Sequence, residues 1–301
     1  MRVPMQVARV VTRFVVSPML DPRLPVSVRR RLIDVTGYAL PSPPGTRRVR
    51  GELGGVPTER VTVPGAVGPH QLLFLHGGGY SVGSARSHRG VIAHLGRAIG
   101  APVHVPEYRL TPEHPHPAAV DDALAAYRAL RTAGHDAQRI AVAGDSAGGG
   151  LAMSLLLRLR EEGEELPGSV GLISPWIDLT LSSPTLQAND HTDALLNAAW
   201  LQQTAADYRG DTDPADLRPL DADLTGLPPI HVLAAMGEIL LGDADALVER
   251  LAAAGAPHTY DRVPGLWHDF VLYAGTLAEA DASVARLGGA LRADCAPVTD
   301  R

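Results

Sequence analysis

The segment GDSAG at residues 144–148 is a candidate nucleophile site. It follows a buried-type apolar run at 140–143 and precedes a stretch of helical spacing at 147–160. G-x-S-x-G between a strand and a helix is the pattern of a nucleophile elbow, in which a sharp turn exposes the serine hydroxyl. Small residues are required two positions before and after the serine, and both positions are glycine. The pattern predicts Ser146 as a nucleophile. It would lie at a helix N-terminus, where the partial positive charge favours an anion that develops during the reaction.

A second glycine-rich segment, HGGGY at residues 76–80, ends the apolar run 71–75. Consecutive glycines leave backbone N–H groups free to point at one oxyanion or phosphate. The spacing fits neither a P-loop nor a dinucleotide loop. We therefore expect an oxyanion hole made by the amides of Gly78, Gly79 and Ala147, the residue after the serine. His76 precedes the serine in the chain and is interpreted as a residue that positions this loop.

A base and an acid should follow the serine, because this architecture orders its triad as Ser, acid, His. His191 lies in an apparent insertion, and His231 and His258 lie at predicted strand starts, the wrong end for a site at the carboxyl edge of a sheet. His268 lies in a loop just after the last predicted strand and is the predicted base.

The acid is expected in the loop after the preceding strand, near residue 236. Glu238, Asp243 and Asp245 are the candidates. Asp243 and Asp245 begin a predicted helix, where acidic residues are common for reasons of capping and dipole. Glu238 follows the strand at once and is the predicted acid, with Asp243 as the alternative.

The composition excludes several other chemistries. All 27 basic residues are arginine, which rules out a Schiff-base or P-loop lysine. The net charge of −6 argues against a nucleic-acid partner. The single cysteine, Cys295, cannot form an internal disulfide, and no histidine or cysteine spacing is typical of a metal site. We expect no metal, no cofactor and no membrane span, and a cytoplasmic location.

Short apolar runs alternate with helical stretches along most of the chain, which predicts an α/β fold with about eight strands in a mostly parallel sheet. Strands are predicted at 49–53, 60–64, 71–75, 103–108, 140–143, 170–174, 230–236 and 258–263. Helices are predicted at 89–99, 118–131, 147–160, 193–208 and 244–254. The expected units are an N-terminal cap segment at 1–44, a core at 45–183 and 228–301, and a cap insertion at 184–227.

The N-terminal segment shows helical spacing of its apolar residues, which are Val7, Val10, Val11, Phe14 and Val15. Arg9 and Arg13 interrupt it, so it is a poor secretory signal. We interpret it as a helix whose apolar face docks on the rest of the protein, with a role as a lid also possible. The alternative interpretation is a helix at a membrane surface.

These motifs together resemble the bacterial hormone-sensitive-lipase family of α/β-hydrolase esterases. The matching segments occur in family order: HGGGY at 76–80, YRLTPEHPHPA at 108–118, GDSAGGG at 144–150, SPWIDLT at 174–180 and GLWHDF at 265–270. The resemblance implies an α/β-hydrolase fold with helical caps, no cofactor, and a homodimer as a possibility. It implies hydrolysis of short- to medium-chain carboxylic esters, with Ser146 and His268 catalytic. The segments 108–118 and 174–180 are structural in that family.

The chain departs from the family pattern at the acid, which is most often Asp and here is Glu238. Trp267, beside the predicted base, is also unusual, and we expect it to line the substrate pocket with Tyr80. An amidase or deacetylase with the same triad, and a ligand-binding protein that has lost catalysis, remain alternatives. The presence of both His268 and Glu238 argues against the second.

Overall fold

The computed structural model describes residues 2–66 and 68–295, and the end of the predicted core range lies outside the described residues. Its centre is an eight-stranded sheet with the order β1-β2-β4-β3-β5-β6-β7-β8. Strands β3 to β8 are parallel, whereas β2 pairs antiparallel with both β1 and β4. The predicted α/β fold with about eight mostly parallel strands is therefore confirmed. The strands are β1 (Arg47–Leu53), β2 (Val56–Thr62), β3 (Gln71–Leu75), β4 (Val103–Pro106), β5 (Ile140–Asp145), β6 (Ser169–Ile173), β7 (Ile230–Ala235) and β8 (His258–Val263).

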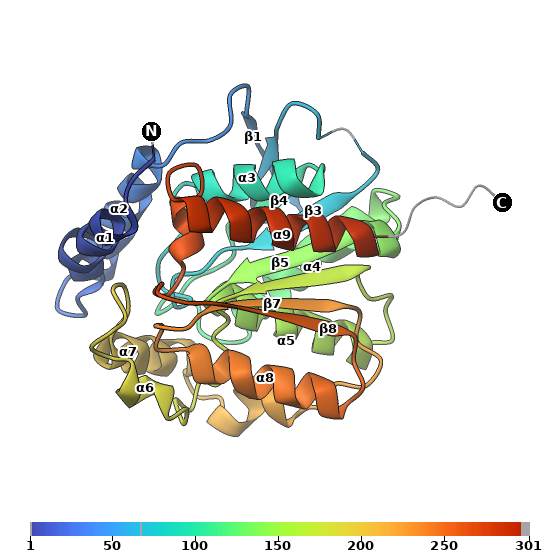
Figure 1. The fold of residues 1–301 in the computed structure, drawn as a ribbon. Coiled ribbons are helices and arrows are strands. Elements are labelled where there is room, and N and C mark those ends of the chain that lie inside the picture. Colours follow the sequence, from blue (N-terminus) through green and yellow to red (C-terminus); the bar gives the residue numbers. More distant parts are fainter. Residues whose placement is uncertain (1, 67, 296–301) are drawn as a thin grey trace.

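Helices cover both faces of this sheet, because its central strands are apolar on both sides and must be shielded from water. Figure 1 shows α3 and α9 above the sheet and α5 and α8 below it. The helices are α1 (Met5–Val11), α2 (Val26–Thr36), α3 (Arg89–Ile99), α4 (Ala118–Thr132), α5 (Ala147–Glu161), α6 (Thr185–Ala188), α7 (Ala198–Arg209), α8 (Leu241–Ala253) and α9 (Ala278–Asp294).

Most element boundaries differ from the sequence prediction by a few residues, and the two largest shifts of a predicted start have local reasons. The second strand runs from Val56 to Thr62 rather than from 60 to 64, because it continues from a tight turn at Gly54 and Gly55, both with positive φ. Helix α7 begins at Ala198 rather than at 193, because the Asn197 side chain accepts the backbone N–H of Trp200 and caps the helix there.

Helices α1 and α2, and helices α6 and α7, lie at the same end of the sheet (Figure 1). They come from the two segments that interrupt the strand–helix alternation. The segments touch, since the Arg13 guanidinium donates to the backbone oxygens of His191 and Asp193. Arg9 also donates to the backbone oxygen of Gly265, in the loop that carries His268.

The prediction that the apolar face of the N-terminal helix docks on the protein is wrong. The five side chains of that face are 40–70% exposed: Val7, Val10, Val11, Phe14 and Val15. The buried side chains of the same segment are Ala8 and Thr12. The helical periodicity was correct, but it does not specify which side of a helix faces the core.

Candidate active site

The turn between β5 and α5 has the conformation of a nucleophile elbow. Ser146 has φ 51° and ψ −121°, a strained combination for a residue with a side chain. A Cβ at Gly144 would lie 2.2 Å from the Gly148 oxygen, and a Cβ at Gly148 would lie 2.0 Å from the Leu75 oxygen. Only glycine fits at either position, so the spacing of the motif follows from the closeness of the backbones. Ser146 directly precedes the fifteen-residue helix α5.

The loop after β3 lies against this turn. Gly78 and Gly79 have φ of 118° and 59°, conformations that favour glycine. Within the described chain, the amides of Gly78, Gly79 and Ala147 donate to no protein acceptor. The next-door amide, of Gly77, donates instead to Asp145 Oδ1 at 3.0 Å. The loop is thus tied to the elbow through Asp145, while its following amides stay available.

Asp145 also pairs with a histidine that the sequence analysis did not single out. His88 Nε2 lies 3.0 Å from Asp145 Oδ2, and both side chains are buried. Burial alone would raise the pKa of the Asp145 carboxyl, but the charge of His88 and its hydrogen bond outweigh burial and lower it. The same pair raises the pKa of His88 against the effect of its own burial. This buried ion pair joins α3's N-terminus to the residue just before Ser146.

His76, by contrast, remains a neutral, structural histidine. Burial lowers its pKa to about 4, and its ring stacks on Tyr108 with centroids 4.3 Å apart. The Tyr108 hydroxyl donates to the His76 backbone oxygen at 2.6 Å. These contacts fix the start of the glycine loop, which agrees with the positioning role expected for His76.

The predicted base and acid come together from the loops after β8 and β7. His268 Nδ1 lies 3.5 Å from Glu238 Oε2, and both residues are almost completely buried. Asp243, the alternative acid, lies elsewhere: its Oδ2 accepts the backbone N–H groups of Ile177 and Asp178 at 2.9 and 2.8 Å. The geometry therefore favours Glu238 over Asp243 as the partner of His268.

Ser146, His268 and Gly78 line one small cavity of about 60 Å³. Its wall includes residues of both cap segments: Val16, Leu20, Ile33, Leu195, Leu196 and Trp200. A serine, a histidine next to a buried carboxylate, and a glycine of the loop after β3 around one cavity are the components of acyl transfer through a serine nucleophile.

Comparisons with known proteins agree with this geometry. The sequence model of the alpha/beta hydrolase fold family matches residues 72–272. A solved structure of an esterase from the bacterial hormone-sensitive lipase family is 38% identical, covers 98% of this chain and 100% of its own, and superposes with a TM-score of 0.91. The chain belongs to this family of α/β-hydrolase esterases.

Curated relatives of this esterase have related activities. An acetyl-hydrolase of Streptomyces hygroscopicus is 40% identical over 80% of this chain and 85% of its own length. Esterase LipU of Mycobacterium tuberculosis is 38% identical over 73% of this chain and 77% of its own. The esterase is thus a serine ester hydrolase by its relatives as well as by its fold.

Asp269, directly after His268, is a site residue of the esterase that the sequence analysis missed. Its Oδ2 lies 3.0 Å from His268 Nε2, and its side chain lines the small cavity. Asp269 has φ 53°, the left-handed conformation that Asp tolerates better than most residues, and this turns its carboxyl back toward the ring. Burial raises the pKa of Asp269 to about 7.

Two carboxyl groups therefore flank the imidazole of the esterase, one at each ring nitrogen. Burial alone would lower the pKa of His268, but Asp269 and Glu238 raise it well above the usual value. Burial also raises the pKa of Glu238, although the contact with His268 opposes this. A single acid was expected from the order of the triad, and no sequence signal distinguishes Asp269 from an ordinary loop residue.

Two further residues contact Glu238, the predicted acid, or the turn that carries it. The Ser174 hydroxyl donates to Glu238 Oε2 at 2.5 Å, so the segment 174–180, expected to be structural, contacts a predicted site residue. Asp193, in the cap insertion, accepts the backbone N–H of Ile239 on Oδ2 at 3.0 Å and that of Leu195 on Oδ1 at 2.9 Å. The cap insertion is therefore hydrogen-bonded to the turn that carries the acid.

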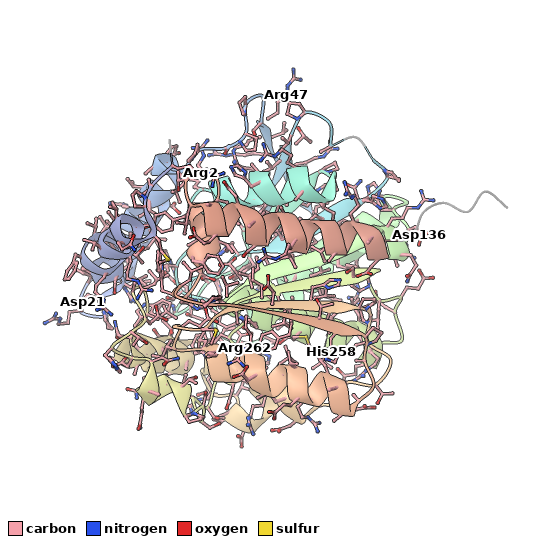
Figure 2. The ribbon with its side chains drawn as sticks, viewed as in Figure 1. Arg2, Asp21, Arg47, Asp136, His258 and Arg262 are labelled. Carbon is pink, nitrogen blue, oxygen red and sulfur yellow. The ribbon has the colours of Figure 1, made fainter. Side chains whose placement is uncertain are left out.

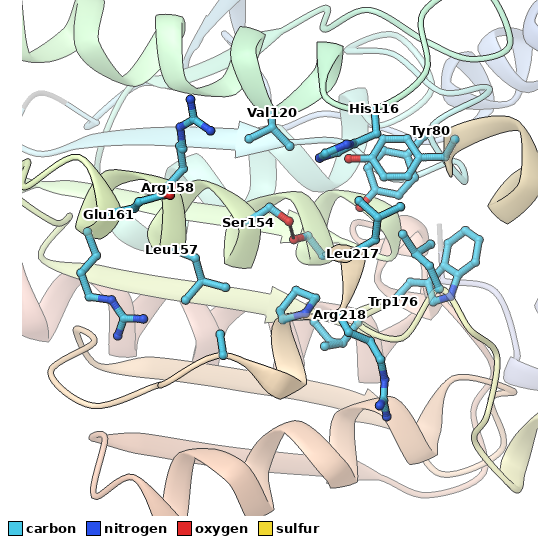
Figure 3. A pocket seen from close by; sticks show the side chains of 17 residues that line it. Tyr80, His116, Val120, Ser154, Leu157, Arg158, Glu161, Trp176, Leu217 and Arg218 are labelled. Atoms are coloured by element: carbon cyan, nitrogen blue, oxygen red, sulfur yellow. Dashed lines mark hydrogen bonds between the residues drawn. The ribbon is translucent and has the colours of Figure 1, made fainter. Parts of the chain in front are cut away.

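The two residues expected in the substrate pocket lie apart from the small cavity. Tyr80 stacks on Tyr208 with ring centroids 3.6 Å apart, and it lines a separate cavity of about 390 Å³ (Figure 3). That cavity extends from Tyr80 and Trp176 to Arg158 on α5. Trp267 is buried beneath the guanidinium of Arg9, which lies 5.4 Å from its ring centroid. Trp267 thus packs beneath Arg9 at the base of the loop that carries His268.

Over the residues that the structure covers, no three His, Cys, Asp or Glu side chains are grouped so that they could hold a metal ion. No helix in the same residues is long and apolar enough to cross a membrane.

Proposed function

We propose that the esterase hydrolyses small carboxylic esters, acetyl esters above all, with Ser146 as nucleophile, His268 as general base and Glu238 as the acid that orients it. The observation that carries the assignment is the convergence of Ser146, His268 and Gly78 on one cavity. The small volume of that cavity, about 60 Å³, favours a short acyl group.

In the first half of the reaction, Ser146 Oγ attacks the ester carbonyl carbon while His268 accepts the serine proton at Nε2, the ring nitrogen that also faces Asp269. The carbonyl oxygen becomes an oxyanion. The amides of Gly78, Gly79 and Ala147 can bind it because they donate to no acceptor within the described residues. The carbon–oxygen bond to the alcohol then breaks, and His268 gives its proton to the leaving oxygen. The product of this half is an alcohol and an acyl-Ser146 ester.

In the second half, a water molecule attacks the acyl carbon and His268 accepts a proton from it. The bond to Ser146 Oγ breaks, the serine recovers its proton from His268, and the carboxylic acid leaves. Glu238, 3.5 Å from His268 Nδ1, stabilises the imidazolium that forms in each half. The Ser174 hydroxyl keeps the Glu238 carboxylate in this position.

The experiment that tests the nucleophile compares a variant of Ser146, which directly precedes α5, with a variant of Ser154 within α5. Ser146→Ala should lower kcat/KM for p-nitrophenyl acetate by at least about 10⁴-fold, because the covalent route is removed. Ser154→Ala is the matched control, since its hydroxyl only donates to the backbone oxygen of Gly150. Near-normal turnover by folded Ser146→Ala would exclude the serine mechanism.

The acyl preference is tested with p-nitrophenyl esters of increasing chain length and with a matched acetanilide. We expect kcat/KM to fall by about 10-fold or more from acetate to octanoate, because longer chains do not fit the cavity. Faster cleavage of the anilide than of the ester would instead identify an amidase. A homodimer and a cytoplasmic location stay predictions, which light scattering and cell fractionation can test.

A further inference from the structure

The N-terminal segment Met5–Val16, made of α1 and the following π-helix η1 (Thr12–Val16), is attached to the protein by its polar side. Arg9 donates to the Gly265 backbone oxygen at 2.6 Å and its guanidinium lies over the Trp267 ring. The hydroxyls of Thr12 and Tyr273 are 2.7 Å apart, and Arg13 donates to the Asp193 backbone oxygen at 3.0 Å. These contacts fix the rotation of the helix about its axis.

Because the polar side faces inward, the apolar side is held in solvent. Its five exposed side chains, Val7, Val10, Val11, Phe14 and Val15, form what we call the valine face. Together they expose on the order of 450 Å², the size at which an apolar patch on a monomeric protein is often functional. An amphipathic helix normally buries this side. Its reversal here indicates that something outside the described chain covers the valine face.

The charge around the valine face indicates what that partner is. Residues 2–34 contain seven arginines and two acidic residues, Asp21 and Asp34, although the whole chain has a net charge of −6. Arg2 and Asp21 lie toward opposite ends of this segment in Figure 2. The side chains of Arg2 and Arg23 are largely exposed, and each lies in a surface ion pair, with Asp281 and Asp21 respectively. Exposed pairs of this kind are weak, so both guanidinium groups can exchange partners. A basic segment with an exposed apolar helical face is typical of proteins that bind anionic membrane surfaces.

A second copy of the chain fits the valine face less well. A stable protein interface buries about 800 Å² on each partner, more than this face offers. In a twofold dimer the same patch meets itself, so two arginine-rich segments would be brought together and repel each other.

The location of the segment also suits a lipid surface. Val16, at its end, and Leu20 and Ile33, which follow, line the cavity that contains Ser146. Figure 1 shows α1 and α2 at the end of the molecule where the caps gather. A surface bound by the valine face would therefore lie beside the caps that enclose the site.

We propose that the valine face docks this esterase on the surface of an anionic lipid bilayer, with its apolar side chains inserted among the headgroups and the exposed arginines of residues 2–34 attracted to lipid phosphates. The docking is peripheral and reversible, because one short helix buries too little apolar surface for permanent insertion. It brings the cavity of Ser146 close to esters dissolved in the membrane.

The test is flotation of the full-length protein with vesicles of phosphatidylcholine and phosphatidylglycerol in equal amounts. We expect the wild type to bind these vesicles and to bind pure phosphatidylcholine vesicles more weakly. Val10→Ser/Phe14→Ser should reduce the partition coefficient by about 10-fold or more. The control Val49→Ser, at a residue 62% exposed on β1, should leave it unchanged.

Further variants separate the outcomes. A second pair in the same face, Val7→Ser/Val15→Ser, should weaken binding like the first, and all variants should hydrolyse p-nitrophenyl acetate like the wild type. Ser146→Ala should still bind vesicles, so this test is independent of the proposed mechanism. Absence of wild-type binding, or equal binding by both pairs and the wild type, would overturn the proposal. A dimer that both pairs dissociate would overturn it too, because the valine face would then belong to a second copy.

Discussion

Replacing Asp269 by Asn should move the pH dependence of the esterase to lower pH. In the wild type the Asp269 carboxylate lies 3.0 Å from His268 Nε2 and helps to raise the pKa of the imidazole well above its usual value of about 6.5. The imidazole must be neutral to accept the proton of Ser146. The value of kcat/KM therefore rises with pH through a pKa above the usual one, and removing the carboxylate lowers that pKa.

The size of the change follows from the distance. Two unit charges 3.0 Å apart interact by about 1.4 kcal/mol even with the screening of bulk water. That energy corresponds to about one pH unit in the pKa of His268. Burial strengthens the interaction, whereas the pKa of Asp269, about 7, leaves its carboxyl partly protonated and weakens it. We therefore expect the acid limb to move down by about one unit.

The assay is kcat/KM for p-nitrophenyl acetate from about pH 5 to about pH 9, the range over which a perturbed histidine titrates. At a pH below both midpoints, kcat/KM divided by its high-pH plateau value should be about 10-fold higher in the variant than in the wild type. Asp243→Asn is the control: burial raises its pKa to about 7 too, but it contacts backbone amides rather than His268.

Two results would refute this reasoning. If folded Asp269→Asn keeps the wild-type midpoint, the carboxylate does not set the pKa of the base. If Asp243→Asn moves the midpoint as far, the effect is a general one of buried charge. Asp269→Glu should restore most of the wild-type profile, since it keeps the charge.

Two more predictions concern Glu238, the proposed acid, and the tight turn around Ser146. Glu238→Gln should lower kcat/KM by about 10²–10⁴-fold, because an amide cannot stabilise the imidazolium. Asp243→Asn should keep its activity, while its free energy of unfolding, measured in urea, should fall by about 1 kcal/mol. If Asp243→Asn instead lost the activity and Glu238→Gln kept it, Asp243 would be the acid. Gly148→Ala places a Cβ 2.0 Å from a backbone oxygen and should destabilise the protein by about 3 kcal/mol or more. Its control is Gly289→Ala on α9, where a Cβ meets nothing within 4 Å, and an equal loss in both would contradict the steric explanation.

The sequence by itself determined the elements whose signal is local. The elbow around Ser146 is readable because its glycines are required by a turn only a few residues long. Strands such as β3 and β8 were predicted at their observed bounds, since apolar runs between turn residues are also local patterns. His268 was predicted as the base because the order of the chain restricts where a base can lie, and the structure places it beside Glu238.

The tertiary structure decided whatever depends on contacts between distant segments. The hydrogen bond from Ser174 to Glu238 joins loops 64 positions apart, and Asp193 reaches the same turn from the cap insertion. Asp269 is adjacent to His268 in sequence, but only a left-handed backbone turns its carboxyl onto the ring.

The orientation of the N-terminal helix shows the same limit. The spacing of Val7, Val10 and Phe14 specifies an apolar stripe, and the sequence interpretation assumed that hydrophobic burial would turn this stripe inward. The partners of the opposite side, Gly265 and Asp193, lie some 180 to 256 positions away. Their hydrogen bonds to arginine turn the stripe outward, and only the folded chain brings those partners to the helix.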